Sequence, residues 1–339
     1  MKKKKNRVIK SIAAVLAALV VLDLFCIWYY NPAKYEWDEY RATDNVRTAN
    51  RFTSRASEGI AYSVTDAYGY NNAEIPGEDG VSVLMMGSSH LEGYNVMPEE
   101  NVAVLLSEML KEEGYDGFIY NIGTSAHNFT RNVANLERAL ERFAPKDYLI
   151  METASIMITE ADINAALNDS YNRNTYTKTY GVEWLTSRPL FAAVYKQWQA
   201  LNQIPTGEEI QEFVITDEVV EAYRVLITEL IRKIADAAEE YGVKPIIYYH
   251  PHLVPQADGT AIADVGDVRC LNAFREVCEN AGVGFVDMTD EFMRNYAENH
   301  ILPHGFINSA PGEGHLNAEG NAMIAQALCA AVLGGEDAA

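Results

Sequence analysis

Cysteine is scarce in this chain and poorly placed for crosslinking. There are 4 cysteines among 339 residues. Cys26 lies in an apolar run near the N-terminus, while Cys270 and Cys278 are eight positions apart on one predicted helix. Eight positions correspond to about 12 Å at helical rise, which is too far for a disulfide. We therefore expect no structural disulfide.

Positive charge is almost absent outside the extreme N-terminus. Six of the 27 lysines and arginines lie in residues 1–10, which hold no acid, so the remainder carries 21 basic against 48 acidic residues and a formal charge of −27. A surface this acidic repels phosphates, which argues against nucleic acid and other polyanions as partners. It does not argue against neutral carbohydrates as partners.

Only one hydrophobic run is long, and it covers residues 11–30. About 20 apolar residues match a ~30 Å hydrocarbon core. The preceding lysines and the aromatic residues 28–30 predict a single-pass anchor in the cell membrane, with its N-terminus cytoplasmic and the main domain outside. A cleaved signal peptide is the alternative, although the bulky residues 26–32 lack its small-residue cleavage site. Asp23 would cost ~2.5–3.5 kcal/mol at mid-membrane, so we expect it to lean outward or to pair with another helix.

The rest of the chain divides by composition. We expect a cytoplasmic basic tail over 1–10, the transmembrane anchor over 11–30, a polar stalk over 31–79 and one domain over 80–335. An insertion at about 153–215 breaks the rhythm of that domain. It also holds aromatic helical patches around Trp184, Phe191, Tyr195 and Trp198. Four of its aromatic residues either cover one end of a sheet or stack on sugar rings; these are Tyr171, Tyr176, Tyr180 and Trp184.

Short buried-type strands alternate with amphipathic helices along the domain. Strands are expected at 81–86, 118–122, 148–151, 246–249 and 283–286, separated by helices that include one capped by Thr216 and ended by Gly242. Helical crossovers of this length predict parallel strands. The fold class is therefore α/β, a three-layer α/β/α domain with a parallel, flavodoxin-like sheet preceded by one transmembrane helix.

A serine follows the first of these strands within a run of small residues. Gly87, Ser88 and Ser89 stand where ligands gather in such sheets, at the carboxyl end of a strand. Leu91 occupies the position where the nucleophile elbow of α/β-hydrolases requires glycine, which disfavours that family. A serine hydroxyl attacks only when a base takes its proton, and neutral imidazole suits that task near pH 7. His315, just before the last predicted helix, is the candidate base.

These motifs and their order resemble the SGNH (GDSL-type) hydrolase family. The resemblance covers about residues 81–333 and leaves the insertion unmatched. It implies that Ser89 is the nucleophile and His315 the catalytic base. Asn121–Ser125 matches the second motif, so Gly123 and Asn121 are the expected oxyanion or substrate-binding residues. Single-span proteins of this layout often act on acylated cell-envelope polysaccharides.

Two positions depart from the family pattern. Gly312 stands where an acid usually precedes the histidine by three residues, so Glu313 or a backbone carbonyl is left to orient His315. The third motif lacks its oxyanion asparagine, and loss of one such donor typically costs ~10²–10³ in rate. Thr153, our candidate substitute, has Ser155 and Asn128 as alternatives.

The remaining histidines show no established metal-ligand spacing. His250, His252 and His304 are the conceivable ligands, but no acid is fixed beside them in sequence. We therefore expect no metal and no cofactor. His90 and His127 are expected to line or border the pocket.

Together these features predict a serine-dependent acyl-ester hydrolase or O-acyltransferase outside the cytoplasmic membrane. Its substrate would be an acylated cell-envelope carbohydrate or another small ester. The alternative, motivated by the missing acid and asparagine, is a catalytically inactive module of the same fold that binds glycan or an envelope protein.

Overall fold

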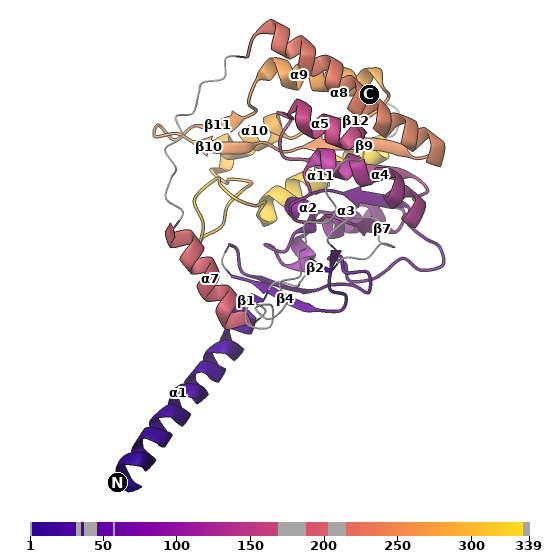
Figure 1. Cartoon of the computed structure of the whole chain (residues 1–339). Coiled ribbons are helices and arrows are strands. Elements are labelled where there is room, and N and C mark those ends of the chain that lie inside the picture. The colour runs from indigo at the N-terminus through magenta and orange to yellow at the C-terminus, as the bar shows by residue number, and fades with distance from the viewer. Residues whose placement is uncertain are drawn as a thin grey trace.

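The apolar N-terminal run forms one long helix, α1 (Lys2–Tyr29), that projects from the rest of the molecule (Figure 1). The computed structural model describes residues 2–31, 35–36, 46–56, 58–168, 188–202 and 215–334. Within α1, the 24 residues Asn6–Tyr29 are apolar and long enough to cross a membrane, and little of their surface is buried. The helix thus has the length and composition of a membrane anchor or of a signal sequence.

Five parallel strands form the central sheet. They are β6 (Val83–Met86), β7 (Ile119–Asn121), β8 (Tyr148–Thr153), β9 (Lys244–Tyr249) and β12 (Gly284–Asp287), in the spatial order β12-β9-β8-β6-β7. All four neighbouring pairs are parallel. Counted along the chain the order is 2-1-3-4-5, which is the flavodoxin-like arrangement, so the expected fold class is confirmed.

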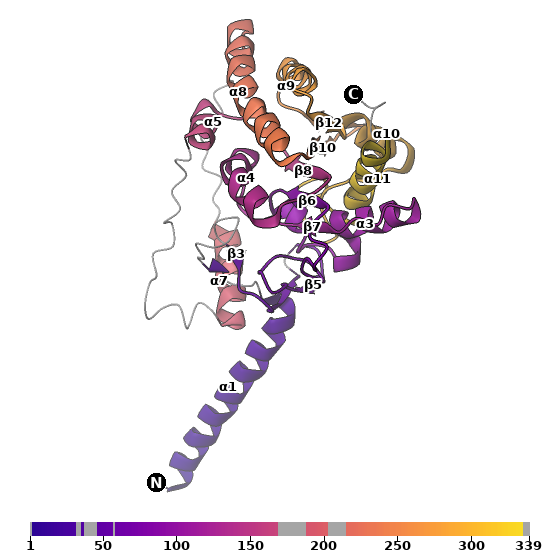
Figure 2. The ribbon, with the colours of Figure 1, turned by 90° about the vertical axis from the view of Figure 1, so that its right-hand side faces the viewer.

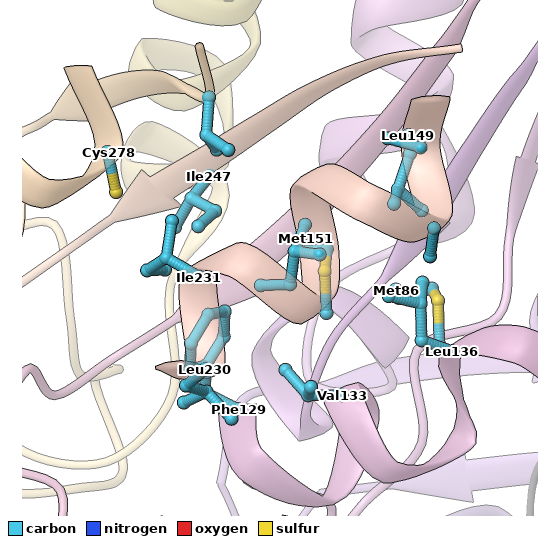
Figure 3. Close-up of a cluster of buried hydrophobic side chains, with 14 of the residues drawn as sticks. Met86, Phe129, Val133, Leu136, Leu149, Met151, Leu230, Ile231, Ile247 and Cys278 are labelled. Carbon is cyan, nitrogen blue, oxygen red and sulfur yellow. The ribbon is translucent and has the colours of Figure 1, made fainter. Parts of the chain in front are cut away.

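Side chains alternate between the two faces of this sheet, because successive residues of a strand point to opposite sides. Leu84 and Met86 of β6 belong to one buried cluster, while Val83 and Met85 belong to the other. Figure 3 shows part of the first cluster, where sheet residues meet the helices that cover them; its labelled residues are Met86, Phe129, Val133, Leu136, Leu149, Met151, Leu230, Ile231, Ile247 and Cys278.

Helices cover both faces of the sheet (Figure 2). The helices α4 (Phe129–Phe143), α8 (Asp217–Tyr241) and α9 (Val268–Asn280) supply the first cluster, and α3 (Val102–Glu112) and α11 (Ala318–Gly334) supply the second. The expected ends of α8 are confirmed: Thr216 Oγ1 accepts from the Val219 N–H at 3.4 Å, and Gly242 ends the helix at φ +69°.

Several short elements were not anticipated. They are α2 (Ser89–Glu92), the 3-10 turn η1 (Pro98–Glu100), α5 (Glu160–Leu167), the antiparallel hairpin of β10 (His252–Pro255) and β11 (Ala261–Asp264), and α10 (Thr289–Asn299). All of them except α10 are shorter than the crossover helices, and so few residues give no clear hydrophobic period. α10, with 11 residues, is as long as α3.

The segment expected as a stalk packs on the domain wherever the structure describes it. Here β1 (Tyr30–Asn31), β4 (Phe52–Arg55) and β5 (Ala61–Val64) form a small antiparallel sheet, and β2 (Tyr35–Glu36) pairs with β3 (Val46–Arg47). Arg47 is 3% exposed and its Nε lies 2.5 Å from Glu92 Oε1, at the end of α2. Burial acts to raise the pKa of Glu92, but the charge and hydrogen bond of Arg47, together with Arg55 and Ser125, hold this pKa below its usual range.

The described parts of the insertion lie in two different places. α5 packs against the outer helices α4 and α8. In contrast, α7 (Pro189–Asn202) packs against α1 and β1. The aromatic residues Tyr171, Tyr176, Tyr180 and Trp184 fall outside the described residues.

Asp23 of α1 pairs with the start of another helix, which was one of the two expectations for it. Its carboxylate lies 2.5 Å from Arg188 Nη2, just before α7, and also accepts the Leu190 N–H at 3.2 Å. The charge within the apolar helix is therefore compensated by the insertion.

Candidate active site

Three side chains from distant parts of the chain meet in one hydrogen-bonded line. Ser89 is the first residue of α2, directly after β6; His315 lies in the turn before α11; and Glu58 lies between β4 and β5. His315 Nε2 is 2.8 Å from Ser89 Oγ, and His315 Nδ1 is 2.8 Å from Glu58 Oε2. This is the hydroxyl, imidazole and carboxylate order of a serine catalytic triad.

Glu58, rather than the expected Glu313, is the acid against the imidazole. Glu313 is exposed, and its backbone N–H donates to Ala310 O in the turn. Both oxygens of Glu58 face His315, since Oε1 accepts the His315 backbone N–H at 2.6 Å. A Cβ on Gly314 would lie 2.1 Å from Glu58 Oε1, so glycine at that position makes room for the carboxylate.

The charge state of Glu58 fits an orienting role. Partial burial acts to raise its pKa, but hydrogen bonds and charge from His315, together with Arg55, hold that pKa below its usual range. Glu58 is therefore an anion at neutral pH, and an anionic carboxylate only accepts hydrogen bonds. It fixes a proton on Nδ1 of His315, which leaves the Nε2 lone pair directed at the Ser89 hydroxyl.

A buried carboxylate holds the turn that presents the serine. Glu152, the second-last residue of β8, is 2% exposed and accepts the Ser88 backbone N–H in a short hydrogen bond. Ser88 Oγ in turn accepts the His90 N–H at 3.2 Å and so caps α2. A Cβ on Gly87 would lie 2.6 Å from Glu152 Oε2, which explains why a glycine precedes the two serines.

Behind this turn lies a cluster of histidines. His250 Nε2 lies 2.9 Å from Glu152 Oε1, and His250 Nδ1 lies 3.2 Å from His304 Nε2. The His90 ring lies between this pair and the triad, 4.8 Å from His250 and 5.0 Å from His315 between ring centroids. His252 stacks on His304 at 4.1 Å. Five histidines therefore adjoin the nucleophile.

Three of these rings, those of His90, His252 and His304, are uncharged at neutral pH. Burial, reinforced by neighbouring histidines, lowers the pKa of His90 and of His304 well below the ordinary value. Burial also lowers the pKa of His252, although its hydrogen bond to Gly312 O opposes the shift. Neutral rings can relay hydrogen bonds, with one nitrogen donating and the other accepting.

Three of these histidines lie close enough together to be considered as ligands of one metal ion. Ligand nitrogens of His90, His250 and His304 lie within 4.8 Å of one another. Two Zn–N bonds of ~2.1 Å span ~4.2 Å at most. The Leu316 N–H already donates to His90 Nδ1 at 3.2 Å, which places the His90 proton on Nε2. The observed arrangement therefore matches a hydrogen-bonded network better than a coordination sphere.

The expected oxyanion residues have other partners. The Gly123 N–H donates to Asn121 Oδ1 at 2.7 Å, and Asn121 Nδ2 donates to Leu91 O at 2.8 Å. Thr153 Oγ1 donates to Ser155 O at 2.7 Å. A Cβ on Gly123 would lie 2.5 Å from Glu92 N, so this glycine is needed for close packing of its loop on α2.

A cavity of about 360 Å³ opens beside Ser89. The loop before α4 and the loop after β8 form its walls, and the expectation that His90 and His127 border it is confirmed. The other lining residues are Ser88, Ala126, Asn128, Phe129, Thr130, Glu152, Thr153, Ala154, Ser155, Met157, Ile158 and Asp162.

No family model and no curated protein matches the chain. Among solved structures, it is similar to a candidate SGNH hydrolase from Slackia heliotrinireducens, at 14% identity and a TM-score of 0.40 over 74% of this chain and 97% of that one. An acetyl xylan esterase gives 14% identity and a TM-score of 0.42 over 74% and 100%. A two-domain esterase active on acetylated mannans gives 15% and 0.41 over 75% and 49%.

The histidine cluster predicts a loss of stability in mild acid. Because the folded-state pKa of His304 lies below the ~6.5 of an unfolded histidine, the unfolded chain binds more protons between those two values. Stability is therefore complete above pH ~6.5 and declines below it, by at most ~1.4 kcal/mol per pH unit for one histidine. Thermal unfolding at several pH values should show a smaller acid loss in His304→Gln than in the wild type.

His300→Asn changes an exposed histidine and serves as the control. Its acid loss should match that of the wild type. Equal acid losses in the His304 variant and the wild type would contradict this account of the cluster.

Proposed function

We propose that this protein is a serine esterase or O-acyltransferase that works through an acyl-enzyme on Ser89. The observation that carries the proposal is the continuous line from Glu58 through His315 to the Ser89 hydroxyl, with both contacts of the imidazole at 2.8 Å. Such geometry matches the distances needed for proton transfer from a nucleophile to its base.

The reaction follows from this geometry. His315 Nε2 takes the proton from Ser89 Oγ as that oxygen bonds to the acyl carbon of an ester. The tetrahedral intermediate then collapses, and the departing alcohol oxygen takes the proton back from His315. Water or a second hydroxyl group, deprotonated by the same nitrogen, next attacks the acyl carbon. The bond from that carbon to Ser89 Oγ then breaks, and Oγ takes the proton back from His315. Water gives hydrolysis, and a sugar hydroxyl gives transfer.

The oxyanion needs donors at the serine. The backbone N–H of Ser89 belongs to the first turn of α2, where amides have no partner within the helix. Asn128 is the second donor that we propose, because it lines the cavity and its Oδ1 is occupied by the Arg131 N–H at 3.0 Å. With Oδ1 fixed on α4 as its cap, the Nδ2 group is turned away from the helix.

We further propose that the substrate is a small acyl ester on a neutral carbohydrate of the cell envelope. The acidic chain disfavours anionic substrates. The cavity beside Ser89 suits a short acyl group, and α1, retained as an anchor, would hold the domain outside the cytoplasmic membrane.

Replacing triad residues tests the chemistry. Ser89→Ala removes the nucleophile, and Glu58→Gln removes the charge that orients His315. Glu58→Gln should lower kcat on an aryl acetate by about 10⁴-fold, the loss seen when a triad carboxylate becomes an amide, and Ser89→Ala should lower it by about 10⁶-fold. Glu313→Gln, which changes an exposed acid on the same turn as His315, should stay near wild type. Undiminished turnover in Ser89→Ala would refute the proposal, whereas glycan binding without turnover would favour the inactive module.

The oxyanion assignment has its own test. Asn128→Ser keeps a side-chain oxygen that can cap α4 but removes the amide donor. We expect kcat to fall by ~10²–10³ with little change in KM, because the contact forms with the developing charge. Ser155→Ala, on the opposite wall of the cavity, is the matched control. A loss in Ser155→Ala alone would transfer the role to that hydroxyl.

A further inference from the structure

Exposed apolar side chains gather where α1 meets the rest of the molecule. On α7 these are Val194, Tyr195 and Trp198, whose exposed fractions are 58%, 48% and 57%. Tyr62 and Val64 of β5 are 52% and 54% exposed. We call these five residues the collar. Figures 1 and 2 show α7 and the β1-β4-β5 sheet beside the end of α1.

The collar continues the surface of α1. Trp28, near the end of α1, is 66% exposed, and its ring packs edge-on against Phe52 of β4 at 5.3 Å. Phe52 stacks in turn on Tyr62 at 6.4 Å. On the other side, α7 lies against α1 itself. The exposed aromatic residues thus form one surface with the last turn of the apolar helix.

The Asp23 contacts fix the level of α7 along α1. Arg188 and the first turn of α7 bind a residue only six positions before Tyr29, where α1 ends. Six residues of helix correspond to ~9 Å. If α1 crosses the bilayer, the start of α7 must therefore lie at the depth of the membrane interface rather than in bulk water.

The side chains of the collar suit that depth. Tryptophan and tyrosine concentrate at the membrane interface, because their rings are apolar and their polar groups reach water. Interfacial helices carry such residues on the face that enters the headgroup region. The pairing of Asp23 with Arg188 also removes most of the cost of an isolated charge near the acyl chains.

We propose that the collar binds the lipid headgroup region of the bilayer in which α1 is anchored. This inference rests on the part of the proposed function that keeps α1 as an anchor, and it does not depend on the chemistry of Ser89. The collar adds a second contact beside α1, which limits tilting of the domain and so fixes the height of its active site above the membrane.

Tryptophan quenching in lipid vesicles tests the collar. The full chain has four tryptophans, so Trp28→Phe, Trp37→Phe and Trp184→Phe together leave Trp198 as the only one. The protein is reconstituted in phosphatidylcholine vesicles that carry bromine on the acyl chain, either close to the headgroup or near the bilayer centre. Trp198 should lose emission to the shallow bromine and much less to the deep one.

A chain that retains only Trp28 is the control for anchoring. Quenching of Trp28 without quenching of Trp198 would overturn the collar and indicate that a protein covers this face instead. The N-terminus of the reconstituted protein is checked by mass spectrometry. Cleavage of residues 1–30 would overturn both the anchor and the collar. Circular dichroism shows whether both variants are folded. The quenching result does not require esterase activity, so it can be interpreted even if the proposed activity is absent.

Discussion

The hydrogen bonds between Glu58 and His315 join the two ends of the domain. Glu58 lies between two strands of the small N-terminal sheet, 257 positions before its partner, and it holds both the ring and the backbone of His315. The buried pair of Arg47 and Glu92 binds the same N-terminal segment to α2, which carries Ser89 at its start. The segment that looks like a stalk in sequence thus contacts both His315 and the helix that begins with Ser89, and it helps to set the relative position of these two residues.

The parallel sheet supplies the other half of the arrangement. Ser89 follows β6, Glu152 ends β8 and His250 follows β9, and the carboxyl ends of these three adjacent strands meet at one edge. Glu152 accepts from Ser88 and faces His250, so one buried carboxylate couples the nucleophile turn to the histidine cluster. A buried carboxylate is stable only with such partners. The buried network of Glu152, His250 and His304 therefore lies directly behind the turn that carries Ser89.

Sequence reasoning succeeded where the signal was local or periodic. The alternation of strands and helices predicted the sheet and its order, and the positions of Ser89 and His315 at the ends of secondary-structure elements predicted that they would meet. It did not find Glu58, because no spacing rule connects residues so far apart in the chain. Gly123, expected as an oxyanion residue, lies close against α2, and its N–H donates to Asn121 Oδ1. The sequence also did not predict the position of α7 against α1, because an aromatic helix has the same residue pattern whether it covers a sheet or faces lipid. Asp23 was the available hint, because a charge within an apolar run requires a partner.

The proposed role of Ser89 as a nucleophile activated by His315 and Glu58 can be tested by labelling. The full-length protein is treated with a fluorophosphonate, which reacts preferentially with activated serine oxygens, and the adduct is located by peptide mapping with mass spectrometry. The account predicts one adduct per chain, located on Ser89, that forms much more slowly in Glu58→Gln. An unlabelled protein, or an adduct on a different residue, would contradict it.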